Sequence, residues 1–366
     1  MIKKLDWYIL KNLLVSFVFC MLLFTVIAVA IDTSEKTDDF VKTGLSGWEI
    51  ATQYYIGFVP WIWSLLFPLF VFIAVIFFTS KMALRSEVIA ILASGTSYNR
   101  FLRPYFIGGI FLSLVLFLGQ RYVVPKTTKI QSDFKANYLD KNDPLKNRQE
   151  SNCYNCFYKR IDSSTYIGIK NYNAETQSSG MFFMDRVKNG KVVYNLRAQS
   201  IKWDTATRKW KAQQVVERTV DSLGERVVMS PEKVVVLKIS HQELIRDEYL
   251  KDKLTTPELT RFIKREELRG TEGLNALKVE AYRRTATAAT VLLLTFIGAV
   301  VSSRKTRGGS GMHLALGIII AAVFIISDRF STVFSTKGNF PPLLAAWTPN
   351  IIFTFVALYL YRKAPK

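Results

Sequence analysis

Six stretches of the chain contain no aspartate, glutamate, lysine or arginine and are long enough to cross a lipid bilayer. A spanning helix needs about 20 predominantly apolar residues, because the hydrocarbon offers no water to exposed backbone groups. The stretches are Leu13–Ile31, Gln53–Ser80, Pro104–Gln120, Thr285–Ser303, Gly308–Ser327 and Gly338–Tyr361. They predict an α-helical membrane protein with six transmembrane helices, and the prolines in the second and sixth predict kinks or late helix starts.

The net charge of the chain argues for the same class of protein. The formal charge is +20, yet the mean hydropathy is +0.15 and 13% of the residues are aromatic. A soluble nucleic-acid-binding protein this basic would have a negative mean hydropathy, and a disordered chain would be poor in aromatic residues. Charged and apolar residues must therefore be segregated, so we expect a sizeable polar domain and no nucleic-acid partner.

The first stretch is open to a second interpretation as a cleaved signal peptide. Lys3 and Lys4 precede it, and Ala28-Val29-Ala30 is similar to a cleavage site. The apolar run is longer than a signal-peptide core, and Asp6-Trp7-Tyr8 is unlike a simple basic leader. We therefore interpret it as a retained transmembrane helix.

Basic residues orient the predicted helices. They are in excess in four short segments, residues 1–12, 81–103, 304–307 and 362–366, whereas the segment after the first stretch is rich in acidic residues. If the helices alternate in direction, all four basic segments lie on one side, which the positive-inside rule identifies as the cytoplasm. Both termini are then cytoplasmic, and residues 121–284 lie outside.

The outside segment has a different pattern. Between residues 123 and 250, runs such as Thr165–Ile169 alternate polar with β-branched or aromatic residues, and turn signals such as Lys188-Asn189-Gly190 separate them. This pattern predicts an antiparallel sandwich, jelly roll or open barrel. Thr256-Pro257-Glu258, with Thr256 as the candidate cap, predicts a return helix within residues 251–284. The predicted domains are residues 1–122, 123–250, 251–284 and 285–366.

The sequence contains no recognisable catalytic or metal-binding set. Cys20 lies in the first stretch, and Cys153 and Cys156 form an outside C-x-x-C, for which a local disulfide or an idle pair fits better than a redox or zinc site. No phosphate-binding loop or hydrolase motif is present. We therefore expect no catalytic residues, metal or cofactor, and energy supplied by a partner or an ion gradient.

The cytoplasmic connection between the second and third stretches predicts a short helix at about residues 84–99. Ser86 is a candidate N-cap, Glu87 would lie near the positive helix end, and Gly95 is placed to end the helix. This pattern suits a helix that rests on lipid and equally suits a docking element for a cytoplasmic partner.

Three segments carry a resemblance to a known family. They are Leu5–Lys11, the motif Arg85-Ser86-Glu87 followed by Ala93-Ser94-Gly95, and Pro341–Asn350. They resemble the opening segment, the coupling-helix motif and the last-span signature of the lipopolysaccharide-export permease family LptF/LptG. The predicted order of three spans, an external β domain and three further spans is also similar to that family's fold.

The resemblance implies a permease subunit of an ABC transporter in the bacterial inner membrane, with a periplasmic β-jellyroll. Its expected partners are a second permease subunit, a cytoplasmic ATPase dimer that uses the ATP, periplasmic jellyroll bridge proteins and lipopolysaccharide, which would enter between spans one and five of facing subunits. By position, Glu87 would contact the ATPase, and Arg85, Ser86 and Gly95 would shape that helix. Lys36 and Lys42 lie where the family meets lipid phosphates, although solvated lysines are the alternative.

Two other functions are compatible with the same layout. One is a membrane-anchored scaffold or sensor with an extracytoplasmic β domain, which would need no ATPase. The other is an ion-driven transporter, which the lack of charged residues within the six stretches disfavours.

Overall fold

A computed structural model describes residues 3–139, 157–173, 176–221, 224–237, 250–269, 273–304 and 309–364. The chain divides into two compact units. The helical unit comprises residues 1–142, 251–260 and 275–366, and the β unit comprises residues 143–250 and 261–274. Cys153, Cys156 and His241 lie outside the described residues.

Six described helical segments are long and apolar enough to cross a membrane, and each predicted stretch overlaps one of them over most of its length. They contain α1 (Lys4–Thr43), η1 (Ala51–Tyr55) with α3 (Ile56–Leu84), α5 (Tyr98–Leu118) with η2 (Gly119–Val123), α6 (Val124–Phe134) and η3 (Lys135–Leu139), α9 (Asn275–Ser302), α10 (Gly309–Lys337) and α11 (Pro342–Lys363). The η segments are π-helical, and two four-residue helices, α2 (Gly47–Ile50) and α7 (Leu250–Lys253), lie in connections. The prediction of six apolar helices is confirmed.

The helices extend beyond the charge-free stretches that predicted them. Helix α1 begins nine residues before Leu13 and continues twelve residues past Ile31. Lys36 and Lys42, expected after the first span, are therefore part of α1 itself. Charged residues end the apolar run without ending the helix, because long charged side chains favour helical backbone and reach water at its ends.

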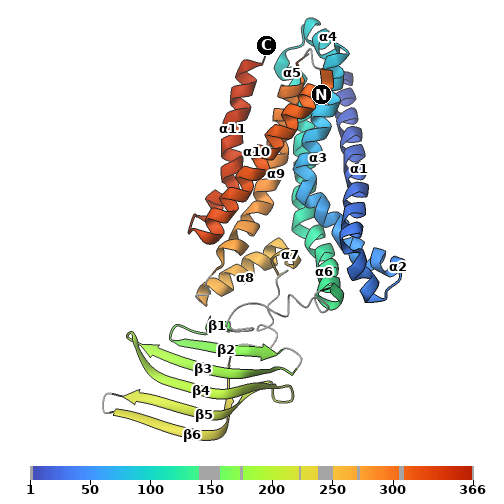
Figure 1. The fold of residues 1–366 in the computed structure, drawn as a ribbon. Coiled ribbons are helices and arrows are strands. Elements are labelled where there is room, and N and C mark those ends of the chain that lie inside the picture. The colour runs from blue at the N-terminus through green and yellow to red at the C-terminus, as the bar shows by residue number, and fades with distance from the viewer. Residues whose placement is uncertain are drawn as a thin grey trace. The chain divides into compact units, whose positions relative to one another are not determined.

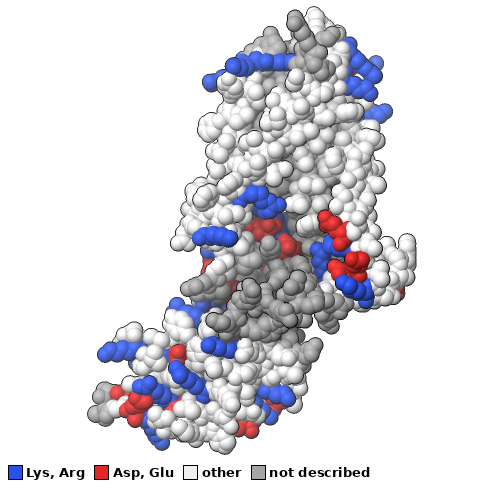
Figure 2. Space-filling model, in the orientation of Figure 1, with Lys and Arg blue, Asp and Glu red and all other residues white. Residues whose placement is uncertain are grey.

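The two ends of the helical unit have different contents. Both chain termini and α4 (Glu87–Ala93) lie at one end, here called the α4 end, and α2 and α6 lie at the opposite, α6 end (Figure 1). Figure 2 shows basic side chains at the α4 end, a broad uncharged band in the middle, and mixed acidic and basic side chains at the α6 end. This distribution is the one that the charge pattern predicted.

Prolines lie inside three of the spanning helices without ending them, at Pro60 and Pro68 in α3, Pro104 in α5 and Pro349 in α11. Pro68 in α3 and Pro349 in α11 lack the N–H that would bond the carbonyls of Ser64 and Ala345. Ser331 Oγ of α10 donates to the Ala345 carbonyl at 2.8 Å, and Gln120 Nε2 lies 3.5 Å from the Ser64 carbonyl. Neighbouring helices thus satisfy the freed groups, as a membrane interior requires.

Helix α9 is the centre of the unit. In its most apolar window 61% of the residues are buried, against 11% for α1 and 17% for α10. Its Thr290 donates to Asn350 Oδ1 at 2.8 Å, and Asn350 Nδ2 donates to the Ala286 carbonyl at 2.9 Å. These hydrogen bonds join α9 to α11, whereas α1 and α10 retain broad exposed apolar faces.

The β unit contains one six-stranded antiparallel sheet in sequential order. Its strands are β1 (Phe157–Arg160), β2 (Thr165–Asn173), β3 (Ser178–Lys188), β4 (Lys191–Asp204), β5 (Lys209–Asp221) and β6 (Gly224–Val235). Asn189 and Gly190 have positive φ in the β3–β4 turn, as their sequence predicted. The antiparallel sheet is therefore confirmed, and the described strands form a simple meander.

One face of this sheet is apolar, and the same face carries an ion pair, because Glu217 lies opposite buried Leu196 and Lys233 lies opposite buried Ala212 in the strand register. Ile167, Ile169, Phe182 and Trp210 are fully buried on the apolar face. On neighbouring strands, Tyr194 Oη and Lys233 Nζ donate to the carboxylate of Glu217 at 2.8 and 2.5 Å. The Lys233 hydrogen bond lowers the pKa of Glu217, so this cross-strand network is strongest above the ordinary pKa of a glutamate and weakens in acid.

Two predicted boundaries differ from the structure. Residues 124–139, expected to open the β domain, form α6 and η3 in the helical unit. Thr255 rather than Thr256 caps α8 (Thr256–Leu268), because its amide and hydroxyl both donate to Glu258 Oε2, at 2.9 and 2.7 Å. The polar composition of residues 124–139 concealed a helix whose buried side chains are largely polar, namely Thr128, Gln131 and Ser132.

The contact between α3 and α6 depends on a glycine and gives a testable prediction. A Cβ at Gly57 would clash with the Thr127 carbonyl and lie 2.6 Å from Gln131 Cβ. We expect Gly57→Ala to destabilise the protein by about 1–3 kcal/mol, the usual cost of overpacking. Gly119→Ala is the control, because its Cβ would meet nothing within 4 Å. Thermal unfolding in detergent measures both, and equal midpoints would contradict this packing.

Candidate functional site

The predicted coupling motif forms a tight turn followed by a short helix at the α4 end. Helix α3 ends at Leu84, and α4 runs only from Glu87 to Ala93, so it is shorter than the predicted residues 84–99. Ser86 stands at the N-cap with φ of 60°, and its side chain makes no capping hydrogen bond. The prediction that the Ser86 side chain caps α4 is therefore wrong. The sharp reversal after α3 imposes a left-handed backbone at Ser86. Gly95, with φ of 83°, follows the end of the helix as predicted.

Glu87 is tied to α1 yet remains partly open to solvent. Tyr8 Oη donates to Glu87 Oε2 at 3.1 Å, and Arg85 Nη1 lies 3.9 Å from Glu87 Oε1. The side chain of Glu87 is 30% exposed and that of Arg85 is 62% exposed. Val88 is buried and anchors α4, while Ile89 is exposed. The motif thus presents a carboxylate bonded to Tyr8, an exposed guanidinium and an exposed apolar side chain at the α4 end.

A buried ion pair, which the sequence analysis did not single out, stabilises this end. Asp6 is 3% exposed and accepts from Arg100 Nη2 at 2.6 Å and from the Lys3 amide at 2.8 Å. The pair joins the start of α1 to the start of α5. A buried carboxylate needs such partners, since an unpaired charge is costly away from water. The sequence did contain an indication that Asp6 matters, because Asp6 lies inside the opening segment Leu5–Lys11 that resembles the family.

The two candidate phosphate-binding lysines have different environments. Lys36 pairs with buried Asp32, donates to Tyr54 Oη at 2.5 Å, and lies 5.1 Å from the Tyr54 ring centroid. Lys42 is exposed and lies 3.3 Å from exposed Asp39. Lys42 is six positions after Lys36 on α1, so the two side chains point about 120° apart around the helix axis. The structure therefore does not bring them together on one face.

An aromatic cluster surrounds Lys36 and contains a further cation. Phe40, Tyr54, Phe58 and Phe134 are buried together at the α6 end. Lys135, which the sequence analysis did not select, lies 5.9 Å from the ring centroids of both Tyr54 and Trp61. Cations over aromatic faces are stabilised electrostatically. Lys135 was not recognisable because its helix was not predicted.

Helices α1 and α10 have broad exposed apolar faces. Their exposed apolar residues include Val15, Phe19, Leu22, Val26, Ile318, Ile319, Ile326 and Phe330. Surfaces of this kind contact lipid chains, a partner subunit or both. Among the described residues, no group of three or more His, Cys, Asp or Glu side chains could hold a metal ion.

The Asp6 pair gives a second prediction. Asp6→Ala leaves Arg100, whose side chain is half-buried, without its carboxylate partner, so we expect a loss of up to about 3 kcal/mol in stability. Asp39→Ala removes only the exposed pair with Lys42 and should cost less than about 1 kcal/mol. Thermal unfolding of the two variants in the same detergent tests the difference, and a smaller effect at Asp6 than at Asp39 would refute the structural role.

Comparison with known proteins places the chain in a family. The family described as lipopolysaccharide export system permease LptF/LptG matches residues 7–363, which include α4, Arg100 and the Pro341–Asn350 segment. A search of curated proteins finds no match. Because the family match extends over essentially the whole chain, this protein belongs to the lipopolysaccharide export permease family LptF/LptG.

Proposed function

We propose that the protein is the permease subunit of an ABC transporter that extracts lipopolysaccharide from the inner membrane and passes it to a periplasmic bridge. A separate cytoplasmic ATPase dimer supplies the energy, and a second permease subunit of the same family completes the pathway. The family match supports the transport of lipopolysaccharide. The placement of α4, with its partly exposed Glu87, at the basic end of the helical unit is the observation that carries the proposed coupling.

The orientation follows from charge. Since the α4 end contains both termini and basic side chains, the positive-inside rule supports a cytoplasmic α4 end. The β unit, which lies between α6 and α9 in the sequence, would then be periplasmic. A cytoplasmic ATPase would then dock on the surface formed by Arg85, Glu87 and Ile89. The carboxylate of Glu87 would pair with a basic residue of the ATPase, while the Tyr8 hydroxyl fixes its position.

The apolar faces of α1 and α10 suit the path of the lipid. Each acyl CH₂ that leaves the bilayer for water costs about 0.8 kcal/mol, so a lipid with several chains needs a dry route. Two subunits that face one another through α1 and α10 would enclose such a route between apolar side chains. Exposed Lys42 is the better placed of the two lysines for a lipid phosphate, and Lys36 would first have to leave Asp32.

The rival functions make different demands on the structure. A scaffold or sensor would not require a cytoplasmic ATPase and would leave the exposed Glu87 surface without a role. An ion-driven transporter would need charged residues within its spanning helices. Helices α1 and α10 are longer than predicted and do include charged residues, among them buried Asp32 and partly buried Asp328. Both carboxylates are, however, paired with basic residues, Lys36 and Arg283. The proposal includes a jellyroll fold for the complete β unit, of which the described strands form one antiparallel sheet.

Charge reversal at Glu87 tests the coupling. Glu87→Lys should repel the basic partner of the carboxylate and reduce ATP-dependent lipopolysaccharide release at least tenfold, while ATP hydrolysis by the ATPase falls much less. Glu232→Lys, an exposed charge reversal on β6, is the control and should leave both activities unchanged. The ratio of lipid released to ATP hydrolysed is the measurement, and an unchanged ratio in Glu87→Lys would refute the coupling role.

A further inference from the structure

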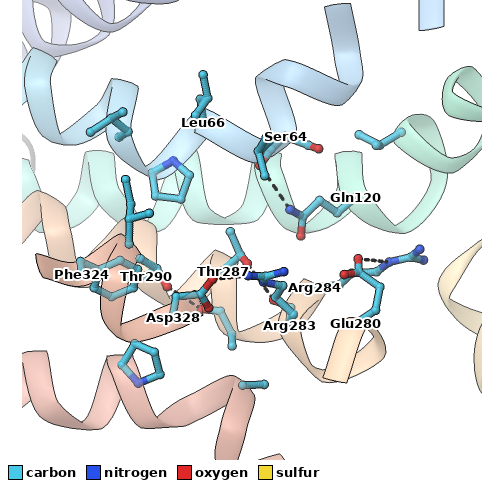
Figure 3. A pocket seen from close by; sticks show the side chains of 18 of the residues that line it. Ser64, Leu66, Gln120, Glu280, Arg283, Arg284, Thr287, Thr290, Phe324 and Asp328 are labelled. Atoms are coloured by element: carbon cyan, nitrogen blue, oxygen red, sulfur yellow. Dashed lines mark hydrogen bonds and ion pairs between the residues drawn. The ribbon is translucent and has the colours of Figure 1, made fainter. Parts of the chain in front are cut away.

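A cavity of about 440 Å³ lies inside the helical unit, among α3, α6, α9, α10 and α11 (Figure 3). Its walls include Pro68 and Pro349, prolines inside α3 and α11. Small-molecule sites have volumes of roughly 300–1,000 Å³. The cavity is therefore large enough for a small ligand, and most of its lining residues belong to α3, α6, α9 and α11.

Polar and apolar groups are segregated along this cavity. Arg283 and Asp328 line the part nearer the α6 end, and Leu294, Ala321 and Phe324 line the part nearer the middle of the unit. Arg283 and Leu294 are eleven residues apart on α9, which corresponds to about 16 Å along the helix axis. A cavity with a charged end and an apolar end over that length matches an amphiphile with a headgroup and a chain.

The charged residues of the cavity are mostly balanced within the chain. Arg283 pairs with Asp328, and Arg284 Nε lies 3.6 Å from Glu280 Oε1. Arg284 also donates to the Leu254 carbonyl at 2.9 Å. For Arg329, which is exposed at the rim, the described residues provide no hydrogen bond or ion pair. One guanidinium is thus available to an incoming anionic group.

Two polar atoms inside the cavity lack partners among the described residues. They are Gln120 Oε1 and Thr128 Oγ1, and Thr128 is only 4% exposed. A buried polar atom without a hydrogen bond costs about 1–3 kcal/mol. The amide oxygen accepts hydrogen bonds and the hydroxyl can accept or donate. A headgroup that carries N–H or O–H donors would satisfy both atoms once their side chains rotate toward the cavity.

The cavity reaches the surface of the unit beside α10. Ile325 and Arg329 both line it, and both are exposed on the outside of that helix. A ligand could therefore enter from the lipid that contacts α10. A single chain is compatible with the available volume, whereas a lipid with many acyl chains on a sugar is not.

We propose that this cavity binds one glycerophospholipid of the surrounding bilayer, with an amine-bearing headgroup such as that of phosphatidylethanolamine. Arg329 meets the phosphate, Gln120 and Thr128 accept from the headgroup donors, and one acyl chain lies against Leu294 and Phe324. The bound lipid fills the space that Pro68 and Pro349 leave between the helices. The inference does not depend on the proposed function, since it concerns a resident lipid rather than the transported one.

A pair of matched substitutions on α9 tests the site. Thr287 lines the cavity, whereas Thr285 is exposed and does not line it. Full-length wild type, Thr287→Trp and Thr285→Trp, each with its partner subunits, are reconstituted in phosphatidylethanolamine and phosphatidylglycerol vesicles, re-extracted in detergent and analysed by lipid mass spectrometry. We expect wild type and Thr285→Trp to retain about one phosphatidylethanolamine per chain, and Thr287→Trp to retain at least fivefold less.

The other outcomes overturn the proposal. Equal retention by the two tryptophan variants places the lipid elsewhere, and loss from both points to general destabilisation. Retention that appears only when lipopolysaccharide is added to the vesicles identifies the cavity with the transported lipid instead. Arg329→Gln, which leaves the cavity volume unchanged, covers the case in which Thr287→Trp fails to fold. It should lower retention at an unchanged unfolding temperature, and full retention contradicts the headgroup assignment.

Discussion

The rest of this structure depends on the need to satisfy backbone hydrogen-bonding groups where no water is present. Six long helices meet that need almost completely. At Pro68 and Pro349 the helices cannot meet it alone, and the freed carbonyls face Gln120 of η2 and Ser331 of α10. These polar side chains therefore link η2 to α3 and α10 to α11 at the positions where the prolines free a carbonyl.

The same constraint explains where polar groups are concentrated. Charged side chains gather at the two ends of the helical unit, and those that are buried have partners, as in Asp6 with Arg100 and Asp32 with Lys36. The α4 end uses its pair to fix the position of the coupling motif. The α6 end uses its pair within an aromatic cluster, which leaves Lys42 as the exposed cation on that part of α1. The proposed ATPase and lipid contacts thus lie at opposite ends.

The sequence was sufficient for features that depend on hydrophobicity and on local backbone chemistry. It predicted the six apolar helices, the antiparallel sheet, the Asn189-Gly190 turn and the helix end at Gly95. It failed where tertiary contacts decide, as at Ser86, whose left-handed backbone results from the reversal between α3 and α4. It also missed α6 and Lys135, because a helix buried through polar side chains gives no apolar period, and it missed the Asp6–Arg100 pair, whose members are 94 residues apart.

Reconstitution of lipid release tests the central claim most directly. The chain, a second permease subunit and the ATPase are placed in vesicles that contain lipopolysaccharide, and transfer to a soluble jellyroll acceptor is followed with and without ATP. The account predicts transfer that requires ATP and this chain together. Equal transfer when the chain is omitted, or transfer that proceeds without ATP, would contradict it.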